Sequence, residues 1–197
     1  SNNEVYPLVI KRRMTRLSKN LGKDSYLNDQ SKDLGIKYLE EYLKLCNKYN
    51  LEEENIIITA TAACRNAIDG AKFIKNIKSK YSLKNIKILS GKEEAEYTFF
   101  GVLDNIKDNN DQKYCVIDIG GGSFQIAGGT KTRFNFGTSV QKGCSQATEL
   151  FELNKPVTKE ALQKAIEYFS QIEIDGLPLN YVPAKIIGVG GTLKIMQ

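Results

Sequence analysis

Short apolar segments alternate with amphipathic segments along most of the chain. Short apolar runs bounded by turn residues are typical of strands buried in a sheet, and an apolar residue at every third or fourth position is typical of a helix. The apolar runs span residues 55–61, 86–89, 114–119, 123–127 and 185–189. The amphipathic stretches span residues 29–49, 144–153 and 159–173, and a further helix is expected from about Lys92. Strands that alternate with helices indicate an α/β fold with a mostly parallel core.

Two further segments add to this pattern. Residues 128–130 (Gly-Gly-Thr) predict a hairpin turn into residues 133–140, which gives the sheet an antiparallel portion. Residues 5–17 are expected to form another strand with a basic continuation. The run 55–61 is apolar throughout and should therefore be covered on both faces. Together these segments predict sheets of mixed direction with helices on both faces.

The length and composition are those of a globular protein. The chain has 197 residues, of which 41% are hydrophobic and 26% charged, so it can bury a core. No run approaches the roughly 18 apolar residues of a membrane helix, and the start of the chain lacks a secretory signal. The four cysteines form no CxxC pair and indicate thiols in a reducing cytoplasm. We therefore expect a cytoplasmic protein that does not enter the membrane.

Charge and the absence of one residue type narrow the possible chemistry. The chain contains no histidine, which excludes Ser–His and Cys–His nucleophile pairs, phosphohistidine chemistry and histidine-ligated zinc. Proton transfer must then fall to carboxylates, lysines, tyrosines or water. The net charge of +5 fits either a solvated lysine-rich surface or a field that attracts polyanions, and composition does not choose between them.

The strongest motif is a strand that ends in an aspartate followed by three glycines. Asp118 lies near the end of the apolar strand 114–119, and Gly120, Gly121, Gly122 and Ser123 follow. Three glycines allow backbone N–H groups to approach an anion, while the aspartate could hold a divalent cation. The alternative is a plain glycine turn capped by Asp118. The motif is neither GxxxxGK[ST] nor a GxGxxG that opens a helix, which disfavours P-loop and Rossmann sites.

Two neighbouring glutamates follow the predicted strand 86–89. Ser90 and Glu93 match a capping box, so Glu93 has a structural role at the start of a helix. Glu94 has no such role. It is either a solvated acid in the first helical turn or a general base placed where open α/β sheets bind their ligands.

Two more strand ends carry groups suited to phosphate. Arg65 follows the strand 55–61 within the sequence TATAACR and offers a planar fork for phosphate oxygens. Gly190, Gly191 and Thr192 follow the strand 185–189 and could form a second phosphate-binding turn. Each signal is weak alone. Together with Glu94 and the Asp118 motif, however, four predicted strands are followed by such groups at their carboxyl ends, which indicates one anion-binding site.

The order of these blocks resembles the exopolyphosphatase/guanosine pentaphosphate phosphatase family, whose members have the two-lobed actin-like (ribonuclease H-like) fold. The blocks are TATAACRNA, LSGKEEAEYTFFGV, VIDIGGGSFQIAGG, SVQKGCSQATELF and GVGGTLKIM. The resemblance implies that Glu94 activates water and that Asp118, together with Glu94, holds Mg²⁺ or Mn²⁺. It further implies that Arg65, the glycine turn and Ser123 bind phosphate. We expect lobes of residues 1–112 and 113–197, divided at the polar stretch 106–113, with the site between them.

The chain departs from the family pattern in several places. The glutamate that usually follows two residues after the serine of DIGGGS is here Gln125, and a usual asparagine is here Asp69. The chain starts after the D-x-G-S-N-S turn with which members usually begin, so the first lobe is expected to be incomplete at its N-terminus. It also stops just past Gly190–Thr192, before the helical domain of long members.

The expected function is release of a terminal phosphate from inorganic polyphosphate or a guanosine penta- or tetraphosphate by metal-assisted attack of water. One alternative is a regulatory protein that binds these ligands without hydrolysis. Another is an ATP-dependent kinase or chaperone of the same fold. We expect no DNA or membrane partner and consider a homodimer possible.

Overall fold

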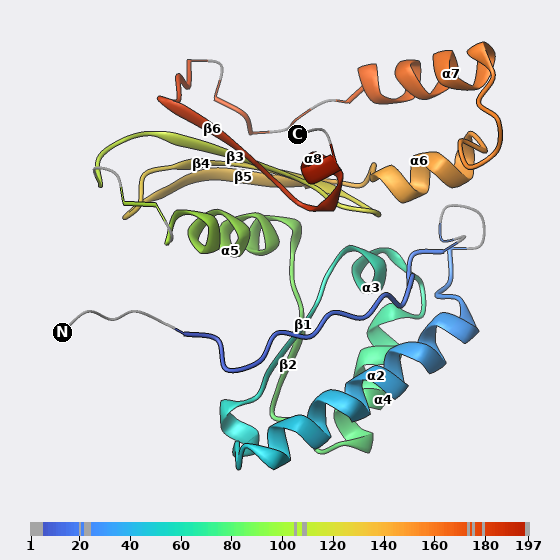
Figure 1. Ribbon diagram of the computed structural model, residues 1–197, viewed down its shortest axis with the longest axis vertical. Helices are drawn as coiled ribbons and strands as arrows, with labels where there is room; N and C mark the ends of the chain where they lie inside the picture. The colour runs from blue at the N-terminus through green and yellow to red at the C-terminus, as the bar shows by residue number, and fades with distance from the viewer. Residues whose placement is uncertain are drawn as a thin grey trace.

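The computed structural model describes residues 6–19, 21, 25–104, 106–107, 110–172, 174, 176–178 and 180–195. Figure 1 shows two parts, each built around its own sheet. The small-sheet part contains α2 (Asp29–Lys48), a short 3₁₀ helix (Glu53–Asn55), β1 (Ile57–Ala60), α3 (Ala62–Asn66), α4 (Gly70–Lys80) and β2 (Asn85–Ile88). The large-sheet part contains α5 (Gly91–Leu103), β3 (Tyr114–Ile119), β4 (Phe124–Gly129), β5 (Phe134–Val140), α6 (Cys144–Leu150), α7 (Lys159–Ser170), β6 (Lys185–Val189) and α8 (Gly191–Ile195).

The large sheet has the order β5-β4-β3-β6 and mixed direction. β3 pairs antiparallel with β4 and parallel with β6, and β4 pairs antiparallel with β5. α5 packs against β3, β4 and β5 on the face turned toward the small-sheet part (Figure 1). The core of this part is made of Ala95, Phe99, Leu103, Tyr114, Val116 and Ala127. α5 precedes residue 112, so a helix of the first predicted lobe packs on the second sheet.

The segment before β6 covers part of the opposite face of the large sheet. The hydroxyl of Tyr181 donates hydrogen bonds to the carbonyls of Tyr114 and Gly129. Its ring packs edge-on against Phe136 at 4.9 Å between centroids. A Cβ atom at Gly128 would lie 2.3 Å from the Phe136 ring, so only glycine fits the strand here.

The predicted hairpin turn at residues 128–130 is therefore wrong in position. Gly128 and Gly129 are the last residues of β4, and the turn is closed between Thr130 and Arg133. These glycines are in the strand because their neighbours approach too closely for a side chain. A Cβ atom at Gly129 would lie 2.1 Å from the carbonyl oxygen of Arg133.

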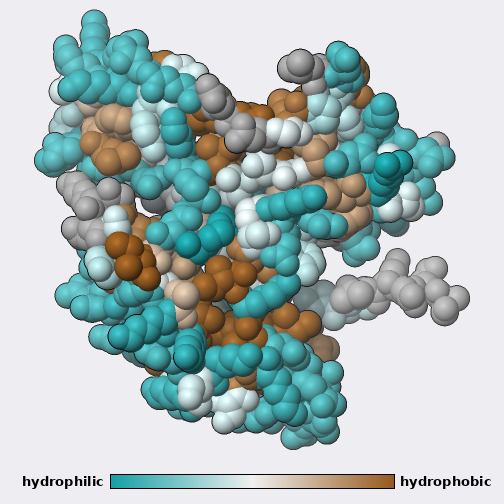
Figure 2. Space-filling model, turned by 180° about the vertical axis from the view of Figure 1, so that it is seen from behind, coloured by the Kyte–Doolittle hydropathy of each residue, from teal (hydrophilic) through white to brown (hydrophobic). Residues whose placement is uncertain are grey.

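The small sheet consists of β1 and β2, which pair in parallel. The predicted strand at residues 5–17 is not observed: residues 6–17 form an irregular segment, and Val5 lies outside the described residues. The expectation that the run 55–61 is covered on both faces is also wrong, because Ile57 is 77% exposed. Figure 2 shows hydrophobic side chains gathered near the middle of the rear face of this part.

Local sequence signals set the starts of the longer helices. The side chain of Asn28 caps α2 by accepting a hydrogen bond from the amide of Ser31. Ser90 and Glu93 form the predicted capping box of α5. Asp69 occupies the N-cap position of α4, but its carboxylate accepts from the amide of Leu27 and from Lys32 instead. Among the described residues, no helix is long and apolar enough to cross a membrane.

Candidate active site

Arg65 and Glu94 meet at the carboxyl edge of the small sheet. Arg65 lies on α3, which follows β1, and Glu94 lies in the first turn of α5, which follows β2. Because β1 and β2 run in parallel, their carboxyl ends share one edge. Nη1 of Arg65 donates to Oε2 of Glu94 at 2.9 Å, with side chains 18% and 16% exposed. The structure thus brings together two residues that the sequence places 29 positions apart.

Two further acceptors hold the guanidinium of Arg65. Nη1 also donates to the carbonyl of Leu89 at 2.8 Å, and Nη2 donates to Oγ of Ser139 on β5 at 3.3 Å. Both terminal nitrogens therefore have a partner, which fixes the plane of the group. The neighbouring Asn66 donates to the side chain of Gln141, so α3 touches the end of the large sheet at two successive residues.

Glu93 has the structural role that the sequence predicts. Its carboxylate accepts from the Ser90 amide at 2.8 Å and from Lys87 at 3.0 Å. The hydrogen bond from the Ser90 backbone, followed by that from Lys87, lowers the pKa of Glu93 to about 2. Glu93 is thus held at the helix start, while Glu94 faces Arg65.

The glycine turn between β3 and β4 is braced from two sides. The Gly120 amide donates to the carbonyl of Ser123 at 2.9 Å. The Gly120 and Gly121 carbonyls accept from the first amides of α6, those of Cys144, Ser145 and Gln146. Within the described residues, the N–H groups of Gly121 and Gly122 donate to no protein acceptor. These two amides, rather than that of Gly120, are the donors available to an anion.

The last residues of the N-terminal segment lie beside this turn. A Cβ atom at Gly122 would be 3.6 Å from Cβ of Ser18. The N-terminal segment, whose Leu17 packs against the small-sheet part, therefore borders the glycine turn.

The second glycine motif lies against Asp118. Gly190 has φ +95°, and a Cβ atom there would be 2.5 Å from Oδ1 of Asp118, so glycine is required for both conformation and space. The hydroxyl of Thr192 donates to Sγ of Cys144 at 3.2 Å. Gly191 is exposed and starts α8. The structure thus places the β6–α8 turn next to Asp118 and to the start of α6.

Asp118 is a half-buried carboxylate without a protein partner among the described residues. Burial raises its pKa, because a charged carboxylate loses hydration there. No group of three or more Asp, Glu, Cys or His side chains that could hold a metal occurs in the described part of the chain. Mg²⁺ commonly takes only one or two carboxylates and keeps several waters. The half-buried carboxylate of Asp118 therefore fits such an ion as one of its ligands.

Two polar side chains, those of Gln125 and Ser139, connect the clusters around Asp118 and Arg65. Gln125, which is 4% exposed, lies directly opposite Asp118 in the β3–β4 ladder. Its Nε2 donates to Oγ of Ser123 at 2.9 Å and to Oγ of Ser139 at 3.1 Å. The sequence marks Gln125 as a departure from the family pattern, but no sequence signal marks Ser139. Because side chains alternate between the two faces of a strand, the sequence could have shown which residues share a face with Ser139. It could not have shown that Gln125 lies opposite Ser139.

Cysteine chemistry is not a feature of this site. All four cysteines are free, and Cys64, next to Arg65, is buried. Burial, followed by the charge of Asp69, raises the pKa of the Cys64 thiol to about 11, so it stays protonated at neutral pH.

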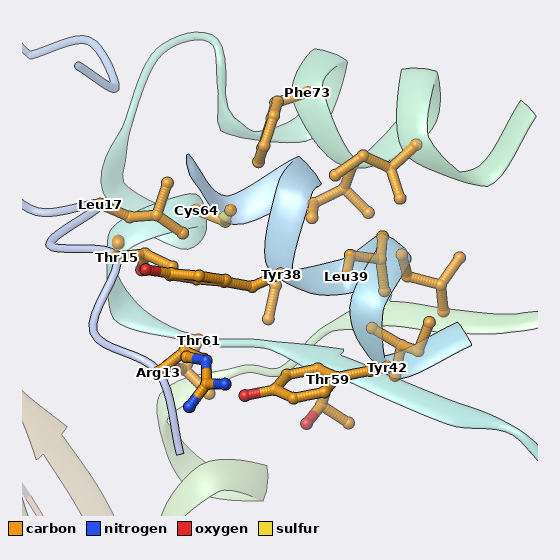
Figure 3. A pocket seen from close by; sticks show the side chains of 17 residues that line it. Arg13, Thr15, Leu17, Tyr38, Leu39, Tyr42, Thr59, Thr61, Cys64 and Phe73 are labelled. Carbon is orange, nitrogen blue, oxygen red and sulfur yellow. The ribbon is translucent and has the colours of Figure 1, made fainter. Parts of the chain in front are cut away.

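A separate pocket of about 310 Å³ lies within the small-sheet part. Figure 3 shows Tyr38 and Tyr42 from α2 facing Arg13 and Thr15 of the N-terminal segment across it. Most of its lining is apolar, and neither Arg65, Glu94 nor Asp118 contributes to it. The pocket is a gap in the packing of this part rather than the chemical site.

The profile of the Ppx/GppA phosphatase family matches residues 1–195. The chain belongs to this family. A bifunctional 3-dehydroquinate synthase/phosphatase of Fusobacterium nucleatum is 30% identical to it over 186 residues, which is 91% of this chain and 27% of that protein.

Solved structures of Ppx/GppA proteins have the same fold. A family member from Aquifex aeolicus is 25% identical, with a TM-score of 0.68 over 93% of this chain and 58% of its own. An exopolyphosphatase from Cytophaga hutchinsonii is 22% identical, with a TM-score of 0.84 over 98% of this chain and 61% of its own. The predicted actin-like α/β fold is confirmed. The chain spans about three fifths of these solved proteins and about a quarter of the Fusobacterium relative.

Proposed function

We propose that this site hydrolyses the terminal phosphoanhydride bond of a polyphosphate-type substrate, either inorganic polyphosphate or guanosine pentaphosphate. Membership of the Ppx/GppA phosphatase family supports the reaction class. The observation that carries the proposal is the contact of Arg65 with Glu94 at 2.9 Å, on the side of the large sheet that also holds Asp118. A phosphate ligand and a possible proton acceptor are thus adjacent.

Arg65 and the glycine turn supply the binding groups. The guanidinium fork matches two oxygens of a phosphate, and the N–H groups of Gly121 and Gly122 can donate to a third. Ser123 adds a hydroxyl beside the turn, where Gln125 holds its oxygen. Each donor is fixed before substrate arrives, which favours stabilisation of charge on the transferring phosphoryl group.

Glu94 is proposed as the general base. Its Oε2 is held by Arg65, and within the described residues its Oε1 accepts no hydrogen bond. Oε1 can take a proton from a water molecule whose oxygen attacks the terminal phosphorus. The new bond joins that oxygen to phosphorus, and the bond from phosphorus to the bridging oxygen breaks, leaving a shortened chain as the leaving group.

Asp118, with Glu94, is proposed to hold Mg²⁺ or Mn²⁺. When bound, the ion would neutralise negative charge on the phosphates. Asp118 is suited to this role because it is half-buried and has no positive partner among the described side chains.

A second candidate function is binding without hydrolysis, in a protein that senses polyphosphate or guanosine tetra- and pentaphosphate. The neutral side chain of Gln125, opposite Asp118, favours it, since a second carboxylate is missing from that position. The two functions share the same ligand groups and differ in whether phosphate is released.

The experiment is phosphate release by the full-length protein and its Glu94→Gln variant, with Mg²⁺ and with Mn²⁺. Gln keeps the shape of Glu94 but cannot accept a proton, so turnover should fall by about 10²–10⁴-fold. Binding of polyphosphate should hold or tighten, because a negative charge is lost beside a polyanion.

Glu93→Gln is the matched control. The oxygen of the substituted side chain can still accept from the Ser90 amide, so turnover should stay near that of the wild type. If Glu93→Gln is the inactive variant, the role of general base is assigned to the wrong residue. If the wild type binds polyphosphate but releases no phosphate with either metal, the sensing function replaces hydrolysis.

A further inference from the structure

A row of polar side chains crosses the large sheet beneath the start of α5. Asp118, Gln125 and Ser139 lie directly opposite one another on β3, β4 and β5. Directly opposed residues project their side chains from the same face of a sheet. This is the face covered by α5, since Val116 and Ala127 of the same alternation belong to the α5 core.

Ser139 receives hydrogen bonds from both parts of the molecule. Gln125 Nε2 donates to its Oγ at 3.1 Å from within the large sheet, and Arg65 Nη2 donates at 3.3 Å from the small-sheet part. A serine hydroxyl accepts at most two hydrogen bonds, so both acceptor positions of Oγ are used. Through Gln125, the same network reaches Ser123 at the glycine turn.

The position of Ser139 also depends on a glycine. A Cβ atom at Gly91, the first residue of α5, would lie 2.9 Å from Cβ of Ser139. The start of α5 therefore rests directly on β5 at this serine. Gly91 has no positive φ, so alanine is compatible with its backbone, and the added Cβ would push Ser139 and the start of α5 apart.

We propose that Ser139 is a positioning residue for phosphate binding. It anchors Nη2 of Arg65 and links that nitrogen, through Gln125, to Ser123. The inference rests on the proposed phosphate site but not on hydrolysis. Without Oγ of Ser139, the guanidinium of Arg65 is held only at Nη1, by Leu89 and Glu94, and the planar group can pivot about that nitrogen and carry Nη2 away from a phosphate.

Ser139→Ala should therefore weaken binding of inorganic polyphosphate by about tenfold, the effect of losing one hydrogen bond to a charged group. The KM for phosphate release should rise by a similar factor while kcat stays unchanged, because Ser139 contacts neither the attacking water nor the base. Thr138→Val is the matched control. It removes a hydroxyl from the adjacent β5 residue, which projects from the opposite face, and should change neither quantity.

Two more variants separate positioning from a general loss of structure. In an Arg65→Ala background, Ser139→Ala should have no further effect on polyphosphate binding measured by calorimetry. Gly91→Ala should reproduce the weaker binding, because it displaces Ser139 without removing its hydroxyl.

The proposal is overturned if Ser139→Ala weakens binding equally with and without Arg65, if Gly91→Ala binds like the wild type, or if kcat falls while KM does not change. A wild type that binds polyphosphate through Ser139 but releases no phosphate would refute hydrolysis and leave this proposal supported. A wild type that does not bind polyphosphate would overturn both.

Discussion

The two sheets of the molecule differ in how completely their surroundings are packed. In the large-sheet part, Ala95, Phe99 and Tyr114 are fully buried between α5 and the sheet. In the small-sheet part, a pocket of about 310 Å³ lies between the N-terminal segment, α2, β1 and α4. Close packing holds side chains in single positions, so the large-sheet part is the more rigid support.

This difference divides the candidate site between two supports. Glu94, Asp118 and the glycine turn all belong to the large-sheet part. Arg65 comes from the small-sheet part and reaches them through its bonds to Glu94 and Ser139. The proposed base and metal ligand, Glu94 and Asp118, are thus on the rigid part. Arg65, which is proposed to bind phosphate, is held in place by contacts between the two parts.

The largest expected effect concerns packing. Leu103→Ala in the core of the large-sheet part should lower the free energy of unfolding by about 3–4 kcal/mol, because it leaves a cavity in a closely packed region. Ile77→Ala removes the same number of carbon atoms beside the existing pocket and should cost only about 2 kcal/mol. Denaturant unfolding measures both. Equal losses would mean that the two parts are packed alike.

A smaller effect is expected where the parts meet. Arg65→Lys should weaken polyphosphate binding about tenfold, since a lysine cannot bond Leu89, Glu94 and Ser139 at once and lacks the phosphate-matching fork. Titration calorimetry gives the affinity. Arg133→Lys, at the exposed turn between β4 and β5, is the control and should bind as the wild type does. If the affinity of Arg65→Lys is unchanged, Arg65 has only a structural role and does not bind phosphate.

The smallest effect concerns Asp118 and its dependence on pH. Because burial raises the pKa of Asp118, its ionised form destabilises the fold as pH rises through that pKa. Asp118→Asn should therefore be slightly more stable than the wild type at neutral pH in chelator. This advantage should vanish below about pH 4, where the wild-type carboxyl is protonated also in the unfolded chain.

The same variant tests the metal. Addition of Mg²⁺ should raise the thermal midpoint of the wild type and leave that of Asp118→Asn unchanged, because binding to the folded state stabilises it. A Mg²⁺ shift that survives in Asp118→Asn would show that the ion binds elsewhere.

Much of the fold could be predicted because its signals are local. The spacing of apolar residues gave the helix Asp29–Lys48 and the strands β3 and β6, and the pair Ser90 and Glu93 gave the start of α5. The predicted hairpin turn at 128–130 and the predicted strand at 5–17 are wrong because neither glycines nor apolar residues specify a turn or a strand by themselves. Gly128 is instead a strand residue made necessary by Phe136, which packs against it from β5.

The sequence by itself determined which residue types follow each strand: an arginine, a glutamate, an aspartate and two glycine turns. Only the tertiary structure decided which of them meet. The ion pair of Arg65 with Glu94, the bond of Arg65 to Ser139 and the placement of Gln125 opposite Asp118 depend on strand register and on how α5 rests on β5. The turns that join β3, β4 and β5 set the register within the sheet, whereas Arg65 meets Glu94 and Ser139 through packing between segments 29 and 74 positions apart, which no local pattern of residues contains.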